Sequence, residues 1–197
     1  MHITEIKAGK NKRYLVYGDE QFLFSLYGKE LKRYHIREEA EIEDTLIQFI
    51  LQEVVFKRAK ERALFLLERR PFSTCMLREK LSQSDYPEPV IEQVIIFLQK
   101  YHYLDDAEYV SMYVNTYSSK KSRKQMVYDL LRKGISKDII DFHFEEVEYS
   151  ERECFEKQFQ KYTRGRDLED RMVKQKIFRY FYGKGFQISL IEEALKR

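Results

Sequence analysis

The sequence is poor in residues that build covalent or metal-held scaffolds. Its two cysteines, Cys75 and Cys154, are far apart and match no metal-ligand spacing. We therefore expect two buried free thiols in a reducing compartment. Tryptophan is absent, and only three prolines and seven glycines interrupt the 197 residues. So few chain-breaking residues favour a mainly α-helical protein.

The chain also lacks the apolar segments of membrane and secreted proteins. No apolar run approaches the ~18 residues that a membrane span needs, and the N-terminal MHITEIKAGK has no hydrophobic signal core. The net charge is only +3, so charge alone does not identify a nucleic-acid binder. A glycine-rich phosphate loop is missing too. We expect a cytoplasmic monomer that contacts no membrane, needs no metal or other cofactor and does not hydrolyse nucleotides by itself.

The first part of the chain has the pattern of β-strands. RYLVYGDEQFLFSLY contains two apolar runs separated by residues 18–21, which predicts a hairpin with a loop of about four residues. The preceding HITEIK supplies a candidate third strand. We read the first 35 residues as strands and assign 1–40 to an N-terminal β-strand extension. Because an isolated hairpin is marginal in water, this sheet should pack against another element.

Helical periodicity begins near Glu43 and continues through ALFLLERRPFS, where Pro71 ends it. We assign residues 41–55 to a connecting helix. One long helix or two jointed helices both fit the pattern.

The most informative feature is a repeat. MLREKLSQSDYPEPVIEQVIIFL, QMVYDLLRKGISKDIIDFHFEEV and KIFRYFYGKGFQISLIEEALKR align on Asp85, Gly134 and Gly185, at intervals of about fifty residues. Six apolar positions recur in all three: Leu77, Met126 and Ile177; Leu81, Leu130 and Phe181; Tyr86, Ile135 and Phe186; Val90, Ile139 and Leu190; Ile91, Ile140 and Ile191; Ile95, Phe144 and Leu195. Each repeat reads as a helix, a tight turn and a second helix.

Helix-ending and helix-starting residues stand at the expected places. Gly134 and Gly185 suit the left-handed position that closes a helix. Ser73 and Ser136 suit N-caps with apolar staple residues around them, and Ser122 with Gln125 suits a capping box.

A further helix precedes each pair, at 56–69, 106–118 and 150–163. We therefore predict three tandem three-helix units, at 56–105, 106–148 and 149–197, in an elongated curved array.

The stretch KYHYLDDAEYVSMYV places Asp105, Asp106 and Glu108 where the first helix of the second unit begins. With Asp105 as N-cap, Glu108 completes a capping box, and the acidic groups favour the positive end of the helix dipole. The alternative is a metal or catalytic centre. Three carboxylates in four residues point in different directions, however, and no paired base or ligand set lies nearby in the sequence. We interpret Asp105 and Asp106 as helix-capping residues.

Three motifs in this order, ALFLLERRPFS, YLDDAEYV and LLRKGIS, together with the tandem units, resemble the RecX family of bacterial regulatory proteins. The resemblance covers roughly residues 55–197, and the N-terminal strands resemble an extension of longer, Gram-positive members. Asp85 stands where a glycine is usual. The resemblance implies a protein that is not an enzyme and that binds the RecA recombinase, chiefly as its nucleoprotein filament on single-stranded DNA. It also implies that the chain modulates, usually by inhibition, the ATPase, strand-exchange and co-protease activities used in recombination, DNA repair and the SOS response.

The candidate contact residues for the RecA filament or DNA are basic. They are Lys120, Lys121, Arg123 and Lys124 in KKSRK; Arg69 and Arg70; Arg132 and Lys133; and Arg164 and Arg166. Cations in KKSRK oppose the dipole of the helix that follows, so local stability does not explain them. Anion contact and a solvated loop remain alternatives there. The pairs at 69–70 and 132–133 end helices, where they also complement the helix dipole.

Two other function classes remain open. A direct DNA-binding helical-repeat protein would bind naked duplex tightly and with a steep salt dependence, whereas weak DNA binding is compatible with a recombinase regulator. A nuclease would need metal-dependent cleavage that Asp106→Asn abolishes.

Overall fold

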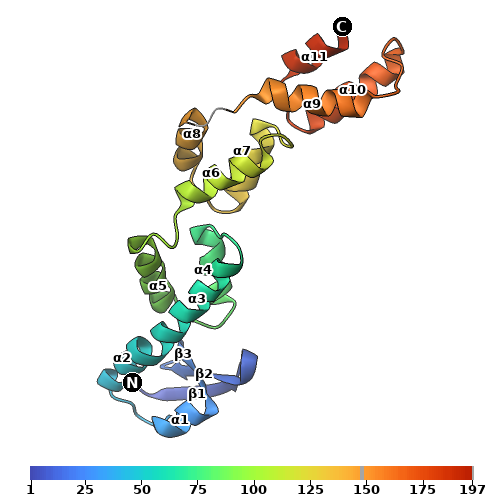
Figure 1. The fold of residues 1–197 in the computed structure, drawn as a ribbon. Coiled ribbons are helices and arrows are strands. Elements are labelled where there is room, and N and C mark those ends of the chain that lie inside the picture. Colours follow the sequence, from blue (N-terminus) through green and yellow to red (C-terminus); the bar gives the residue numbers. More distant parts are fainter. Residues whose placement is uncertain (147–148, 197) are drawn as a thin grey trace. The chain divides into compact units, whose positions relative to one another are not determined.

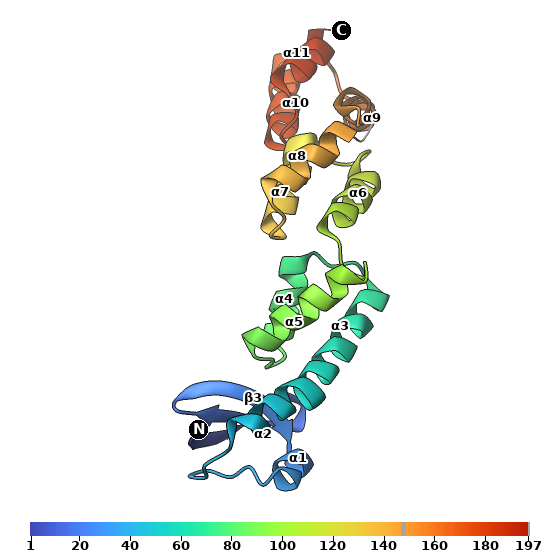
Figure 2. The same cartoon turned by 90° about the vertical axis from the view of Figure 1, so that its left-hand side faces the viewer.

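The computed structural model describes residues 1–146 and 149–196 and divides them into two compact units, Met1–Asp105 and Asp106–Arg197. The first unit contains the N-terminal strands and the first three-helix repeat, and the second contains the other two repeats (Figures 1 and 2). The elongated curved array of repeats stays a prediction. The predicted boundary at 148/149 and the chain end at 197 touch residues outside the described ranges.

The N-terminal sheet has three antiparallel strands in the order β1 (Ile3–Ala8), β2 (Arg13–Gly18) and β3 (Gln21–Tyr27). The short helical turn η1 (Lys10–Lys12) joins the first two. The third strand is therefore confirmed.

The prediction of a hairpin loop of about four residues is wrong, because Gly18 pairs with Gln21 and only Asp19 and Glu20 form the turn. Both have positive φ, 47° and 65°, as in the two-residue hairpin turns that match strand twist.

Strands do not extend to residue 35, because α1 (Gly28–Arg33) follows β3 directly. The Glu30 carboxylate accepts a hydrogen bond of 2.7 Å from the backbone N–H of Tyr27, which satisfies a free donor at the helix start. The sequence reading missed this helix because its six residues are too short to show helical periodicity.

The connecting helix is continuous with the first helix of the first repeat. It runs through α2 (Asp44–Phe49), a π-helical segment η2 (Ile50–Phe56) and α3 (Lys57–Arg69), with right-handed helical backbone at both junctions. Of the two arrangements that the sequence left open, the structure has one long helix. Strand β3 packs against η2, so the sheet and the helix share one core.

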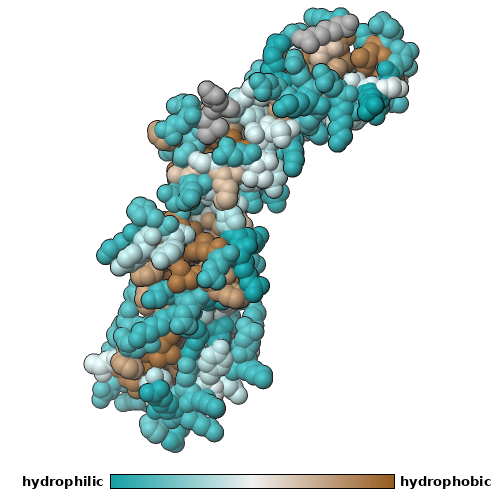
Figure 3. Space-filling view, in the orientation of Figure 1, coloured by the Kyte–Doolittle hydropathy of each residue, from teal (hydrophilic) through white to brown (hydrophobic). Residues whose placement is uncertain are grey.

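The structure contains the three three-helix repeats that the sequence predicts. They are α3, α4 (Thr74–Ser82) and α5 (Glu88–Lys100); α6 (Asp106–Tyr117), α7 (Arg123–Arg132) and α8 (Lys137–Glu146); and α9 (Glu151–Thr163), α10 (Arg171–Gly183) and α11 (Ile188–Lys196). Four of the six recurrent apolar positions are buried in all three repeats. In the first repeat these positions are Leu77, Leu81, Tyr86 and Ile91. The other two are buried in the first repeat, whereas Ile139, Leu190 and Leu195 are partly exposed. Figure 3 shows that the larger visible hydrophobic areas lie over the N-terminal unit.

Each repeat closes its second helix with the same turn. In the second repeat, the N–H of Ile135 donates to the carbonyl of Leu130 at 3.3 Å, and the N–H of Gly134 donates to that of Leu131 at 2.9 Å. This is the Schellman motif. Gly134 has φ 76° and Gly185 has φ 79°.

The first repeat makes the same turn without glycine. Asp85 adopts φ 56°, and the N–H of Tyr86 donates to the carbonyl of Leu81 at 3.4 Å. An aspartate tolerates the left-handed region better than most residues. The replacement of glycine therefore leaves the turn intact.

The N-terminal sheet binds this first turn. Arg13 is buried and donates to the Ser84 carbonyl at 2.6 Å and to the Ser25 hydroxyl at 3.1 Å. The Ser25 hydroxyl in turn donates to the Asp85 carbonyl at 2.9 Å. The Arg13 guanidinium lies 3.9 Å from Asp85 Oδ2, which is buried and makes no hydrogen bond among the described residues. The expectation that the strands pack against another element is confirmed.

Arg13→Met should lower the free energy of unfolding by about 3 kcal/mol, because it leaves the Asp85 carboxylate without its counter-charge. The loss should shrink when Asp85→Gly is added, since that change removes the carboxylate and suits the positive φ. Urea denaturation of the two single variants and the double variant measures both effects. An equal cost of Arg13→Met in both backgrounds would show that the carboxylate is not the cause.

Gly185→Ala should destabilise the chain more than Gly165→Ala. Both glycines have positive φ, which costs an alanine about 1–2 kcal/mol. A Cβ at Gly185 would also lie 3.1 Å from Ser122 Oγ, whereas one at Gly165 meets nothing within 4 Å. Thermal unfolding of both variants separates backbone strain from the contact. Equal losses would remove the contact from the explanation.

Candidate functional site

The predicted helix caps are largely as expected. Ser73 accepts a hydrogen bond from the N–H of Met76 at 3.3 Å, and Ser122 accepts one from that of Gln125 at 3.2 Å. Ser136 accepts a longer one from Ile139 at 3.5 Å. These serines are structural residues at helix starts.

Asp105 directly precedes α6, and Asp106 is its first residue, as a capping role requires. Within the described ranges, no group of three or more His, Cys, Asp or Glu side chains could hold a metal ion.

The basic run KKSRK is divided between two roles. Lys121 Nζ lies 2.6 Å from Asp129 Oδ2 and 2.8 Å from the Tyr113 hydroxyl, and 4.3 Å from the centre of the Tyr117 ring. Local stability therefore does explain this lysine, contrary to the expectation for the run. Its three neighbours in the run, Lys120, Arg123 and Lys124, are exposed.

Burial and hydrogen bonding shift the pKa values of both members of the Lys121–Asp129 pair. Burial alone would raise the pKa of Asp129, but hydrogen bonds from Lys121 and Tyr113 outweigh it and hold the pKa below its ordinary value. Burial opposes the charge of Lys121 as well, yet the hydrogen bond to Asp129 raises its pKa. Both directions show that the charged pair is favoured in the folded state.

The loop that carries KKSRK is fixed against the third repeat. The Lys121 carbonyl accepts hydrogen bonds from the Tyr149 hydroxyl at 2.9 Å and from Cys154 Sγ at 3.4 Å. The Ser122 hydroxyl donates to the Lys184 carbonyl at 2.7 Å. These bonds hold the loop against the N-terminal end of α9 and the C-terminal end of α10.

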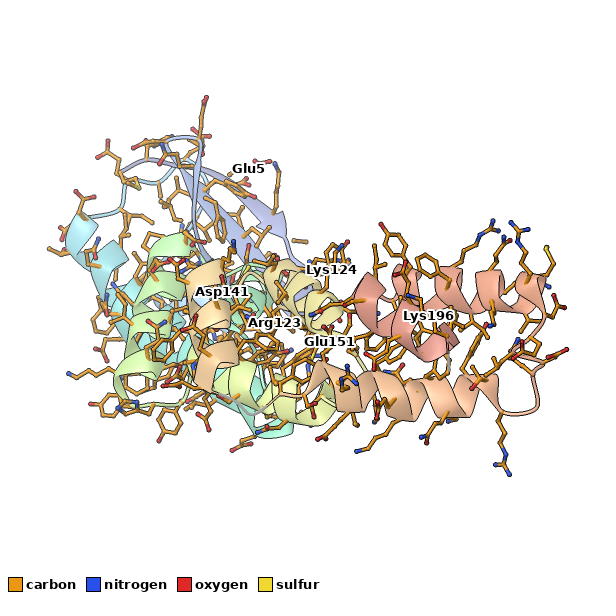
Figure 4. The ribbon with its side chains drawn as sticks, turned by 90° about the horizontal axis from the view of Figure 1, so that it is seen from above. Glu5, Arg123, Lys124, Asp141, Glu151 and Lys196 are labelled. Atoms are coloured by element: carbon orange, nitrogen blue, oxygen red, sulfur yellow. The ribbon has the colours of Figure 1, made fainter. Side chains whose placement is uncertain are left out.

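Arg123 and Lys124 stand at this junction, near Glu151 (Figure 4). The backbone N–H of Arg123 donates to Glu151 Oε1 at 3.2 Å, and its guanidinium lies 5.0 Å from the centre of the Phe144 ring.

The sequence predicted that both cysteines are buried free thiols. Cys154 is buried and free, as expected, but Cys75 is partly exposed, so the prediction is wrong for Cys75.

A groove in the second unit is lined mainly by basic and polar side chains. Its volume is about 700 Å³. We call it the basic groove, and its lining residues are Ser119, Lys120, Lys157, Gln158, Lys161, Tyr162, Arg164, Arg166, Tyr180 and Lys184. Six of these described lining residues are cations and none is a carboxylate.

Two stacked tyrosines form part of the wall of the basic groove. The rings of Tyr162 on α9 and Tyr180 on α10 lie 4.0 Å apart at an interplanar angle of 7°. Arg166 lies 4.3 Å from the Tyr162 ring centre and donates through Nε to the Tyr162 carbonyl at 2.7 Å. Lys184 lies 4.7 Å from the Tyr180 ring and donates to Gln158 at 2.8 Å. The stack thus holds two cations at defined positions.

The structure brings together only some of the sequence-predicted contact residues. Lys120, Arg164 and Arg166 line the basic groove, whereas Arg132 and Lys133 lie at the end of α7, beside tyrosine rings. In the N-terminal unit, Arg69 and Arg70 lie 4.2 Å and 4.3 Å from the ring centres of Phe65 and Phe72.

The sequence predicted three of the ten lining residues of the basic groove and missed seven, among them Lys157, Lys161, Tyr162, Tyr180 and Lys184. One signal was available: residues 157–166, KQFQKYTRGR, hold four cations and no acid. The contribution of α10 was not readable from the sequence, because it depends on how α9 and α10 pack.

Tandem three-helix units with Schellman closures and a small N-terminal sheet define a helical-repeat protein, and its second unit carries a basic groove. Sequence models of the first, second and third three-helix domains of RecX match residues 59–98, 105–141 and 151–195. The chain is 31% identical to the regulatory protein RecX of Clostridium acetobutylicum, over 98% of this chain and 94% of that protein. It is 28% identical to the one from Caldanaerobacter subterraneus subsp. tengcongensis, over 99% and 98%.

Solved structures give the same result. A crystal structure of regulatory protein RecX aligns over 97% of both chains with a TM-score of 0.63 and 25% identity. RecX from Lactobacillus salivarius, at 23% identity, shares the fold over 72% of this chain, again with a TM-score of 0.63. The chain therefore belongs to the RecX family of regulatory proteins.

Among the helices that the structure describes, none combines the length and the apolar character of a transmembrane segment.

Asp129→Asn should lower the free energy of unfolding by about 1 kcal/mol at pH 7, since the pair is partly exposed. The folded-state pKa of Asp129 is lowered, so its contribution is present above the unfolded pKa and is lost as the pH falls through the folded value. The difference from wild type should therefore begin to shrink below about pH 4, the ordinary pKa of an aspartate, and should vanish only at pH values below the lowered folded-state pKa. Urea denaturation at several pH values measures it, with the exposed Glu145→Gln as control. A difference that persists in acid would contradict the ion-pair explanation.

Proposed function

We propose that this chain binds the RecA recombinase as its nucleoprotein filament on single-stranded DNA. It lowers the ATP hydrolysis, strand exchange and co-protease activity of that filament, and so acts in recombination, DNA repair and the SOS response. The observation that carries the proposal is membership of the RecX family, with all three helical domains matched in order. Its relatives are regulatory proteins.

The proposed contacts are exposed cations. Arg69, Arg70, Arg123, Lys124 and Arg132 have no ion pair with a carboxylate among the described residues, so their charge is available to a partner. Arginines on aromatic rings keep their donors free while the ring restricts their motion. Lys133 and the cations of the basic groove complete the proposed set, and Lys121 is left out because it is paired internally.

Repeated units also favour an extended partner. The three domains repeat the same three-helix unit, and repeat proteins bind along an extended surface instead of in one pocket. A helical filament presents the same site at regular intervals, so several weak contacts add up through avidity.

Addition of this protein to preformed filaments should lower the rate of single-stranded-DNA-dependent ATP hydrolysis by the host recombinase. Charge reversal to Glu at Arg69, Arg70, Arg123 and Lys124 together should raise the concentration for half-inhibition about tenfold, because each lost contact costs about 0.2–1 kcal/mol. Steady-state ATPase measurements during titration give both values.

The matched control reverses four exposed cations outside the proposed set: Lys29, Lys32, Lys137 and Lys176. It should inhibit like wild type. Unchanged ATP hydrolysis in filaments that remain intact, together with no binding to them, would contradict the proposed function. Equal loss of inhibition in both variants would contradict the proposed contact surface alone.

A further inference from the structure

Four of the six cations of the basic groove lack the partners that a purely structural role would give them. Lys120, Lys157, Lys161 and Arg164 are exposed and have no ion pair or hydrogen bond from their side chains among the described residues. Like charges at i and i+4 on a helix, such as Lys157 and Lys161, weaken it by a few tenths of a kcal/mol. Local stability therefore does not account for this arrangement.

The two anchored cations are pre-organised for a ligand. Arg166 and Lys184 are each held by one hydrogen bond and one aromatic ring of the Tyr162–Tyr180 stack. Fixing them in advance lowers the conformational entropy that binding would otherwise cost. Arg166 still has free guanidinium donors, which suit phosphate oxygens.

We propose that the basic groove binds the sugar-phosphate backbone of single-stranded nucleic acid. A phosphodiester chain carries one negative charge per nucleotide, so it can meet several cations that no described lining carboxylate opposes. Basic grooves with aromatic walls are how proteins hold single strands without sequence preference. Phosphates contact Lys120, Lys157, Lys161 and Arg164, and the Tyr162–Tyr180 stack forms the wall beside them.

The shape of the site distinguishes a single strand from a duplex. Duplex readers place a protruding helix or strand into a groove of the DNA. Here the cations line a recess between α9, α10 and the loop at residues 119–120, which a flexible single strand can enter but a stiff duplex cannot.

An acidic protein segment is the other polyanion, but protein interfaces have an apolar core. The two rings of the recess are stacked on each other and overlaid by cations, so they do not offer such a core.

This inference deepens the proposed function, because it rests on a partner that carries single-stranded DNA and gives the chain its own site for that strand. Its test uses the purified full-length chain and a labelled oligonucleotide without recombinase. Failure of this test would thus leave the ATPase result untouched, and failure of the ATPase test would leave this one untouched.

The probe is a fluorescein-labelled oligothymidylate of about 20 nucleotides, titrated in fluorescence anisotropy at several salt concentrations. The variant is Lys157→Gln with Lys161→Gln, and the matched control is Lys137→Gln with Lys176→Gln, which changes net charge equally outside the groove. The groove variant should bind about tenfold or more weakly near 0.1 M salt, and its salt slope should fall by about one unit. The control should bind within about twofold of wild type.

Several results would overturn the proposal. One is an equal loss of affinity in the groove variant and the control, which would mean that only net charge matters. Another is tighter binding of a duplex of the same length. A third is competition by oligoglutamate at equal charge concentration as effective as that by unlabelled oligothymidylate, which would favour an acidic protein segment. No binding by wild type at low salt would overturn it too.

Discussion

The closure of each helical repeat by a Schellman turn is the constraint on which the rest of the structure depends. A helix leaves its last carbonyls without partners, and the left-handed residue lets two backbone N–H groups turn back to them. The same residue directs the next side chain, Tyr86, Ile135 or Phe186, into the core of its repeat. One backbone conformation therefore both ends a helix and begins the hydrophobic packing of the next.

Turn carbonyls that take no part in the Schellman hydrogen bonds accept hydrogen bonds from neighbouring elements, and these bonds hold the repeats in place. In the first repeat, the carbonyls of residues 83–85 accept hydrogen bonds from Lys10, Arg13 and Ser25 of the sheet region. In the third, the Lys184 carbonyl accepts one from Ser122, which also caps α7. Buried carbonyls are costly when unpaired, so these side chains join elements that are distant in sequence. Because Ser122 binds the Lys184 carbonyl, Lys184 and the nearby Lys120 line the same groove.

The sequence predicted what depends on local spacing. The recurrent apolar residues, Gly134, Gly185 and the capping serines mark the repeats because periodicity, positive φ and caps need only neighbouring residues. It did not predict the two-residue turn at Asp19–Glu20 or α1, since charged residues in a turn and a six-residue helix carry weak signals. It also could not show that Asp85 is paired with Arg13. That contact joins elements that are distant in sequence, and only tertiary packing brings such elements together.

The same limit explains why a run of basic residues is an ambiguous signal for binding. Adjacent lysines at 120 and 121 look alike in the sequence, yet Lys121 is neutralised by Asp129 inside the repeat and Lys120 faces the basic groove. A cation contributes to recognition only when the fold leaves its charge unpaired and places other unpaired cations beside it. Lys157, Lys161 and Arg164 meet that condition from a different repeat, so the charge that matters for a partner is assembled by packing and not by composition. This is why a chain with a net charge of only +3 can still concentrate six cations on one recess.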